Sequence, residues 1–201
     1  MNAGSDAAYI AFEGERRIAS GDLSEVARAA RQMLDRRKDA SILILDDKTS
    51  APVEIDFRGS VDDVLARLPK QDLSAIAEDA AVKLPRGPGR PKLGVVAREV
   101  TLLPRHWDWL SQQKGGASVA IRKLIDQARK TSEDKDRIRF AQEAAYRFMS
   151  TMAGNRPHYE EAIRALFAHH HKRFENLVAE WPADVRDHAS RLAKRAFRPE
   201  A

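Results

Sequence analysis

The sequence predicts a mixed α and β fold at the N-terminus, a basic central segment and a helical C-terminal region. Three observations lead to this prediction: short apolar runs between turn residues in the first third of the chain, a cluster of Gly, Pro and cations near its middle, and apolar residues at helical spacing afterwards. Such runs are typical of strands, and a 3.6-residue repeat is typical of helices. We expect an α+β domain at 7–68, a linker at 69–97, a strand–helix–helix segment at 98–130 and a helical region at 137–197.

The α+β domain is expected to hold a four-stranded antiparallel sheet with two helices. The strand-like runs are AYIAF, RRIA, SILIL and VEIDF. Glu13-Gly14-Glu15 between the first two runs is a hairpin signal. In VEIDF the apolar residues alternate, which places Val53, Ile55 and Phe57 on one face of the strand.

Capping residues mark the starts of both helices in this domain. Asp22 has Glu25 three residues later, and Ser60 has Asp63 at the same spacing. This spacing lets the two side chains of each pair satisfy each other's free backbone amides. The first helix then repeats apolar residues at helical spacing, which predicts one buried face: Leu23, Val26, Ala27, Ala30, Met33 and Leu34.

The C-terminal region is expected to contain three further helices. The first ends at Gly154, PHYEEAIRALFAHHHKRFENLVAEW reads as one long amphipathic helix, and Pro182 starts the last one. On a continuous helix, the three histidines at 169–171 point about 100° apart and cannot converge on one metal ion. A weaker helical pattern lies at 70–84.

Composition and charge narrow the function classes. The chain has no cysteine, which excludes disulfides and thiol chemistry, and it has no long apolar run or signal-peptide pattern. We therefore expect a cytoplasmic protein. The net charge of +5 is unevenly distributed, because residues 86–130 hold ten Lys/Arg against three Asp/Glu, whereas residues 1–85 are net acidic. A concentrated basic segment favours phosphate-rich partners.

The segment 98–130 follows an order of strand, helix, turn and helix. A strand of about six residues ends at Pro104, a helix follows, and Gly115-Gly116 breaks it. We expect Trp107 in the core, and Trp109 in the core, in a dimer contact or on the surface. The second helix begins near Ser118, and its apolar residues share a face: Ile121, Leu124, Ile125 and Ala128.

This order resembles the ribbon-helix-helix family of bacterial DNA-binding proteins. The resemblance implies that two chains pair their strands, that the ribbon enters the DNA major groove, and that the second helix holds a phosphate at its start. The expected contact residues are Arg98, Thr101, Arg105 and Ser118. One strand phase buries Val100 and Leu102 and the other buries Glu99 and Thr101, and the sequence leaves both open.

The preceding stretch PRGPGRPKLG resembles an AT-hook, a short motif for the minor groove of A·T-rich DNA. A glycine allows close approach, a proline holds the arginine extended, and a narrow groove attracts the inserted guanidinium. The stretch has Pro88 where the usual motif has a second arginine. The residues expected to contact DNA are Arg86, Gly89, Arg90, Pro91 and Lys92.

Taken as a whole, the chain resembles an uncharacterised bacterial family, domain of unknown function 2239. The resemblance runs nearly end to end and includes RRIASGDLSEVARAAR, VEIDFRGS, GRPKLGVVAREVTLLPRHWDWL, AQEAAYRFMSTMAG and WPADVRDH. It implies a bacterial origin and supplies no activity, cofactor or catalytic residue.

These observations predict a homodimeric DNA-binding protein of the nucleoid, either a transcriptional regulator or a nucleoid-associated factor. No phosphate-binding, zinc-protease or nucleophile motif is present in the sequence, so we expect no enzyme activity, cofactor, metal or membrane association. The alternative is a protein-interaction module or antitoxin-like adaptor, in which the N-terminal domain binds a protein partner.

Overall fold

The computed structural model describes residues 8–69 and 98–197. The chain divides into two compact units. The larger unit combines the residues up to Leu68 with those from Ser132 onward, and the smaller unit spans Pro69–Thr131. Segments that the sequence analysis treated as an N-terminal domain and a C-terminal helical region therefore belong to the same larger unit.

The larger unit is built on a three-stranded antiparallel sheet of order β2-β1-β3. The strands are β1 (Tyr9–Glu13), β2 (Arg16–Gly21) and β3 (Ile42–Asp46). Between β1 and β2 the chain turns tightly at Gly14, whose φ of 57° lies in the region that glycine adopts without strain. The predicted hairpin is confirmed.

The predicted four-stranded sheet is wrong, because VEIDF is not a strand. The segment meets β3 only through a bridge between Leu45 and Pro52 and a bond from the Val53 amide to the Ile44 carbonyl. Beyond this point Arg67 donates to the carbonyls of Asp56 and Arg58. The alternation did predict the buried face, because Val53, Ile55 and Phe57 pack against an apolar cluster.

Two helices of the larger unit begin at the predicted capping residues. They are α1 (Leu23–Arg36) and α2 (Val61–Arg67). Asp22 accepts from the Glu25 amide at 2.8 Å and Glu25 accepts from the Asp22 amide at 3.1 Å. Ser60 and Asp63 form the same reciprocal pair ahead of α2, so both capping predictions are confirmed.

The remaining described helices are α4 (Pro104–Ser111), α5 (Ala117–Ala153), α6 (Tyr159–Phe167), α7 (His171–Val178) and α8 (Ala183–Lys194). Two predictions of helix extent are wrong. The two helices expected on either side of residue 131 are one continuous helix, α5. The long helix expected after Pro157 is two helices, because the chain turns at His169, whose φ is 58°.

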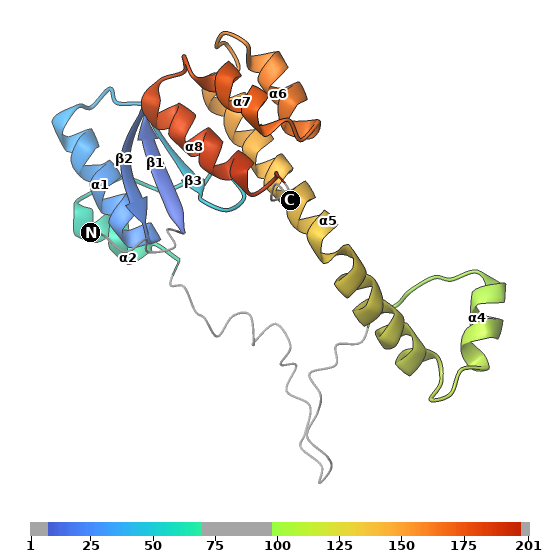
Figure 1. Cartoon of the computed structure of the whole chain (residues 1–201). Coiled ribbons are helices and arrows are strands. Elements are labelled where there is room, and N and C mark those ends of the chain that lie inside the picture. Colours follow the sequence, from blue (N-terminus) through green and yellow to red (C-terminus); the bar gives the residue numbers. More distant parts are fainter. Residues whose placement is uncertain (1–7, 70–97, 198–201) are drawn as a thin grey trace, which may run out of the picture. The chain divides into compact units, whose positions relative to one another are not determined.

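The sheet of the larger unit is buried on both faces (Figure 1). Ile10, Phe12 and Leu45 face a core that the later part of α5 and helices α6, α7 and α8 complete. Ala11 and Ile44 face α1 on the other side. Side chains alternate across a strand, so burial on both faces explains why YIAF and ILIL are apolar without interruption.

An ion pair joins the sheet region to α8 across 144 residues of sequence. The Arg191 guanidinium donates to both oxygens of Asp47, with one distance of 2.8 Å, and the Asp47 side chain is 4% exposed. The neighbouring Asp46 instead caps its own turn by accepting from Lys48 and Thr49. The two adjacent carboxylates therefore both have structural partners.

Candidate nucleic-acid interface

The smaller unit begins, in the described residues, with residues 98–103, which form no helix or strand and lead into α4; we call them the extended segment after the backbone of their last residue. Leu103 is the helix N-cap with φ −67° and ψ 149°, and Pro104 takes the first helical position, where a missing amide costs nothing. After α4, Gly115 and Gly116 adopt φ values of 93° and 76°. Positive φ favours glycine, so this pair produces the turn that lets α5 fold back toward α4.

Residues 98–103 form no strand in the described chain, contrary to the sequence prediction. A strand is defined by its ladder of backbone hydrogen bonds, and the described part of the smaller unit has no second extended segment to supply one. The predicted Pro104 boundary and the glycine turn are confirmed.

An apolar groove lies on the smaller unit, with a volume of about 320 Å³. Its lining comes from the extended segment, α4 and the start of α5: Leu102, His106, Trp109, Leu110, Ile121, Leu124 and Ile125. Leu110 is buried, whereas Trp109 is 49% exposed. The predicted core position of Trp107 is wrong, since this side chain is 44% exposed. Two helices alone cannot surround an indole ring.

The predicted contact residues divide between described and undescribed parts of the chain. Arg98, Thr101, Arg105 and Ser118 are all exposed on the smaller unit. Arg98 and Thr101 lie in the extended segment, Arg105 in the first turn of α4, and Ser118 in the first turn of α5. The AT-hook-like residues lie outside the described residues: Arg86, Gly89, Arg90, Pro91 and Lys92.

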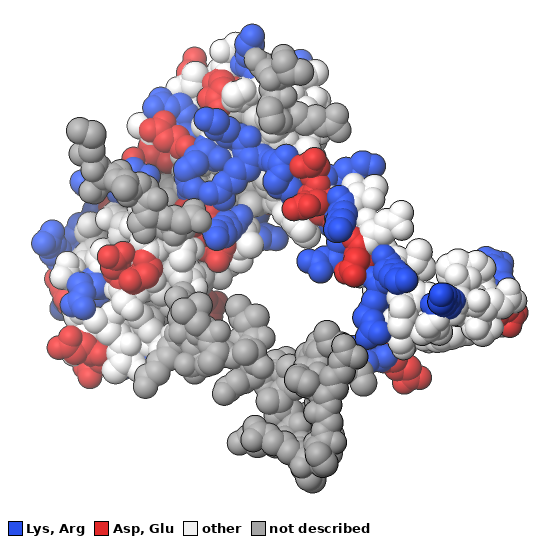
Figure 2. Space-filling view, turned by 60° about the horizontal axis from the view of Figure 1, so that its bottom comes forward, with Lys and Arg blue, Asp and Glu red and all other residues white. Residues whose placement is uncertain are grey.

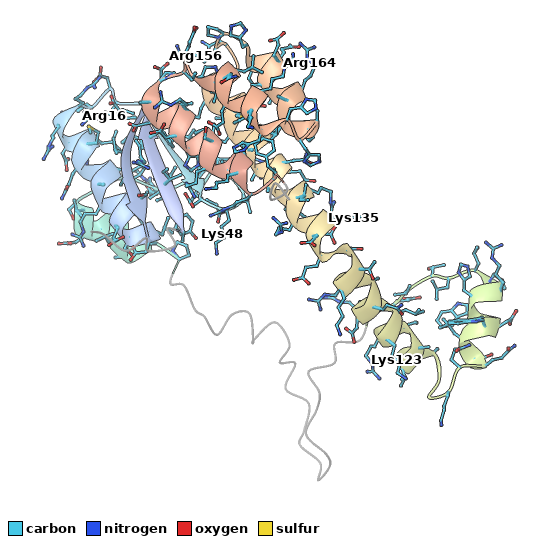
Figure 3. The ribbon with its side chains drawn as sticks, viewed as in Figure 1. Arg16, Lys48, Lys123, Lys135, Arg156 and Arg164 are labelled. Carbon is cyan, nitrogen blue, oxygen red and sulfur yellow. The ribbon has the colours of Figure 1, made fainter. Side chains whose placement is uncertain are left out.

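Cations outnumber acids in the described part of the smaller unit. Residues 98–131 contain seven Lys/Arg and three Asp/Glu. Lys123 projects from the first half of α5 into solvent (Figure 3). Figure 2 shows broad uncharged areas on this unit with Lys and Arg side chains around them. The unit therefore combines an open apolar surface with a positive charge.

Sequence reasoning missed one of the groove residues, His106, and left the burial of Leu102 open between two strand phases. The spacing 106, 109 and 110 places three side chains on one side of α4, and that signal was available. The position of Leu102 was not, because its phase depends on how the extended segment meets the helices.

The larger unit holds a buried histidine that the sequence did not single out. His188 is 2% exposed and its ring lies 4.3 Å from the ring of Phe148. Nδ1 lies 2.9 Å from Nη2 of Arg191, and Nε2 is buried without a partner among the described residues. Burial, and then the nearby Arg191 guanidinium, lower the pKa of His188 to about 4. The His188 ring is therefore a packed part of the core, in contact with the rings of Phe12 and Phe148.

Other site classes find no support in the described residues. Residues 8–69 and 98–197 contain no group of three or more His, Cys, Asp or Glu side chains placed to hold a metal ion. None of the described helices has the length and apolar character needed to cross a membrane.

The described residues define a mixed α and β protein with a closed, sheet-centred larger unit and a small basic helical unit. The chain belongs to the family of uncharacterized proteins conserved in bacteria called DUF2239, which it matches over residues 8–193. The resemblance stated from the sequence is confirmed at this level. No curated protein and no solved structure matched the chain.

Proposed function

We propose that the chain is a homodimeric DNA-binding protein, acting as a transcriptional regulator or a nucleoid-associated factor. One observation carries the proposal: the small unit joins a surplus of cations to an apolar groove that the described residues leave open. Six of the large apolar side chains exposed in the described chain belong to this unit: Val100, Leu103, Trp107, Trp109, Leu124 and Ile125.

The open groove supports self-association. A clustered apolar surface of this kind marks an interaction site. The extended segment beside the groove offers unpaired backbone groups, which a second copy satisfies through an antiparallel pair about a twofold axis. The second copy is therefore the occupant of the groove, and the pair forms a ribbon that resembles the ribbon-helix-helix arrangement.

The charge of the unit supports DNA as the ligand. A two-stranded ribbon fits the major groove, and cations such as Arg105 next to it contact backbone phosphates. Ser118 lies in the first turn of α5, where free backbone amides favour a phosphate. The stretch containing Arg90 adds a minor-groove contact under this proposal.

Fluorescence anisotropy with labelled A·T-rich and G·C-rich duplexes at several salt concentrations tests the proposal. We expect binding that weakens steeply with salt, with a slope of about −0.9 for each phosphate neutralised. Arg105→Ala should reduce this slope by about one. Arg28→Ala removes the same charge from the exposed side of α1 in the larger unit, and it should leave binding unchanged.

A separate experiment tests the AT-hook-like stretch. Arg90→Ala should weaken binding to A·T-rich duplexes by roughly 1–3 kcal/mol, the scale of one good groove contact. An unchanged A·T preference would contradict the minor-groove contact of the AT-hook-like stretch, but it would not contradict the proposed ribbon. No binding of the full chain to either duplex at low salt would overturn the proposal and favour the protein-interaction alternative, in which a small partner protein copurifies.

A further inference from the structure

We propose that the larger unit binds a small aromatic carboxylate in a second groove, between α5 and the end of α6. This groove has a volume of about 360 Å³, a size typical of sites for small molecules. Its lining residues all belong to the larger unit: Glu143, Tyr146, Arg147, Ser150, Thr151 and Phe167. We call it the α5–α6 groove. The proposal goes beyond DNA binding and does not depend on it.

Two exposed aromatic rings form the apolar part of the α5–α6 groove. Residues of one face of α5 line the groove at helical spacing, and Phe167, the last residue of α6, completes it. The Phe167 ring lies 6.1 Å from the Tyr146 ring, and the planes of the two rings meet at 59°. Both side chains are nearly half exposed. A third ring can therefore pack against the face of one ring and the edge of the other, an arrangement that aromatic rings prefer.

Arg147 supplies a positive charge in a fixed position. Its Nη1 donates to the Thr49 carbonyl at 2.5 Å, which ties the guanidinium to the turn after β3. No carboxylate of the described residues lies within ion-pair distance of Arg147. The hydrogens on Nε and Nη2 are therefore open to a ligand, and this edge of a guanidinium binds a carboxylate through two parallel hydrogen bonds.

Two hydroxyl groups line the groove beside the guanidinium. Thr151 donates its hydrogen to the Arg147 carbonyl at 2.9 Å, so its oxygen offers a ligand only an acceptor. The Ser150 and Tyr159 hydroxyls lie 2.7 Å apart, and either one can donate to the other. When Tyr159 donates, the Ser150 hydrogen is open to a carboxylate oxygen. The α5–α6 groove thus joins a site for an aromatic ring to donors for a carboxylate.

The charges of the groove favour a ligand with one negative charge. Glu143 also lines the groove, but its carboxylate lies 4.0 Å from Nη1 of Arg139, one turn earlier on α5. Arg147 is then the lining cation without an acidic partner in the described chain. A carboxylate matches this single charge. A phosphate monoester carries about 1.5–2 negative charges at pH 7, so Glu143 would repel it more strongly.

Titration of the ¹⁵N-labelled full chain with sodium benzoate, followed through the amide chemical shifts, tests the proposal. Benzoate should shift the amides of residues 143–151 and of Phe167, with a Kd on the order of 1 mM. Benzamide has nearly the same shape without the charge, so it should bind at least tenfold more weakly. Phenyl phosphate should also bind more weakly than benzoate.

Four variants assign the binding to particular side chains. Arg147→Gln should weaken benzoate binding at least tenfold, because it removes the charged hydrogen-bond donors. Phe167→Ala should weaken it about tenfold through the loss of the ring contact. Glu143→Gln should strengthen it by roughly threefold, because it removes a repelling charge. Arg173→Gln is the matched control, since it removes an exposed arginine that does not line the groove, and it should leave binding unchanged.

Several results would contradict the proposal. An absence of shifts, or shifts confined to amides away from the α5–α6 groove, would overturn the site itself. Tighter binding of benzamide or phenyl phosphate than of benzoate would overturn the carboxylate as ligand. Equal losses in Arg147→Gln and Arg173→Gln would show a nonspecific charge effect. Phe167→Ala changes an exposed position, so it tests the site even if Arg147→Gln disturbs the turn at Thr49.

Discussion

The two compact units differ in how completely they bury their large apolar side chains. In the larger unit, a sheet is covered on both faces, and Phe12, Phe148 and Val26 are fully enclosed. In the smaller unit, two helices leave Trp107 and Trp109 nearly half exposed. The comparison indicates that the larger unit has a complete core, whereas the described residues of the smaller unit leave large apolar side chains exposed.

Removing a buried aromatic side chain from the core of the larger unit should have the largest effect on stability. Phe148 is fully buried and lies 5.6 Å from the Phe12 ring, so Phe148→Ala should lower the free energy of unfolding by about 3–5 kcal/mol. Phe140 is on the same helix and is 57% exposed. Phe140→Ala should therefore change the value by less than about 0.5 kcal/mol. Urea unfolding of both variants measures the difference, and equal losses would contradict the packing described for α5.

Acid should weaken the larger unit through His188. The folded state holds this ring neutral with a pKa of about 4, whereas the unfolded chain has the ordinary value of 6.5. As the pH falls from 6.5 toward 4, the unfolded chain takes up a proton that the folded chain refuses. Stability that is fully present above pH 6.5 is therefore lost, by roughly 3 kcal/mol over this range.

Urea unfolding between pH 7 and pH 4.5 measures this loss. His188→Gln and His188→Phe remove the titrating group, so they should flatten the pH dependence even where they lower stability overall. His158→Gln, at an exposed position, should keep the wild-type dependence. Parallel curves for wild type and both His188 variants would contradict the assignment.

Removing an indole from the open groove should change association more than folding. Trp109→Ser should raise the dissociation constant of the proposed homodimer at least tenfold, because the proposed interface would lose a large apolar side chain. Phe167 is the matched control, since it is 48% exposed on the larger unit against 49% for Trp109. Sedimentation equilibrium of Trp109→Ser and Phe167→Ser compares them. A monomeric wild type, or equal effects of the two substitutions, would contradict the proposal that the smaller unit carries the dimer interface.

The loss of a helix cap should have the smallest effect on stability. Asp22→Ala removes a reciprocal cap of α1 and should cost about 1 kcal/mol of stability, measured by thermal unfolding. Ser24→Ala, two residues further on, removes a hydroxyl without touching the cap, and it should be neutral or slightly stabilising. In the smaller unit, α4 starts at Leu103 with no side-chain cap. A loss from Ser24→Ala as large as that from Asp22→Ala would contradict the capping role.

Local sequence signals predicted local structure well. The Asp22 and Ser60 caps, the Gly14 hairpin, the turn at Gly115-Gly116 and the helix end near Gly154 all depend on residues close together in the chain. The candidate site was predicted only in part. Its position in the small basic unit was visible from charge and spacing, but the groove and the exposure of Trp107 were not.

The sequence by itself determined the caps, the turns, the charge distribution and which strands are apolar on both faces, because these follow from neighbouring residues. Only the tertiary structure decided that VEIDF stays outside the sheet, that Asp47 pairs with Arg191 and that the sheet is covered by helices from the far end of the chain. Only the tertiary structure placed Leu102 in the lining of the groove. These features depend on contacts between distant residues, whose free energies no local pattern encodes.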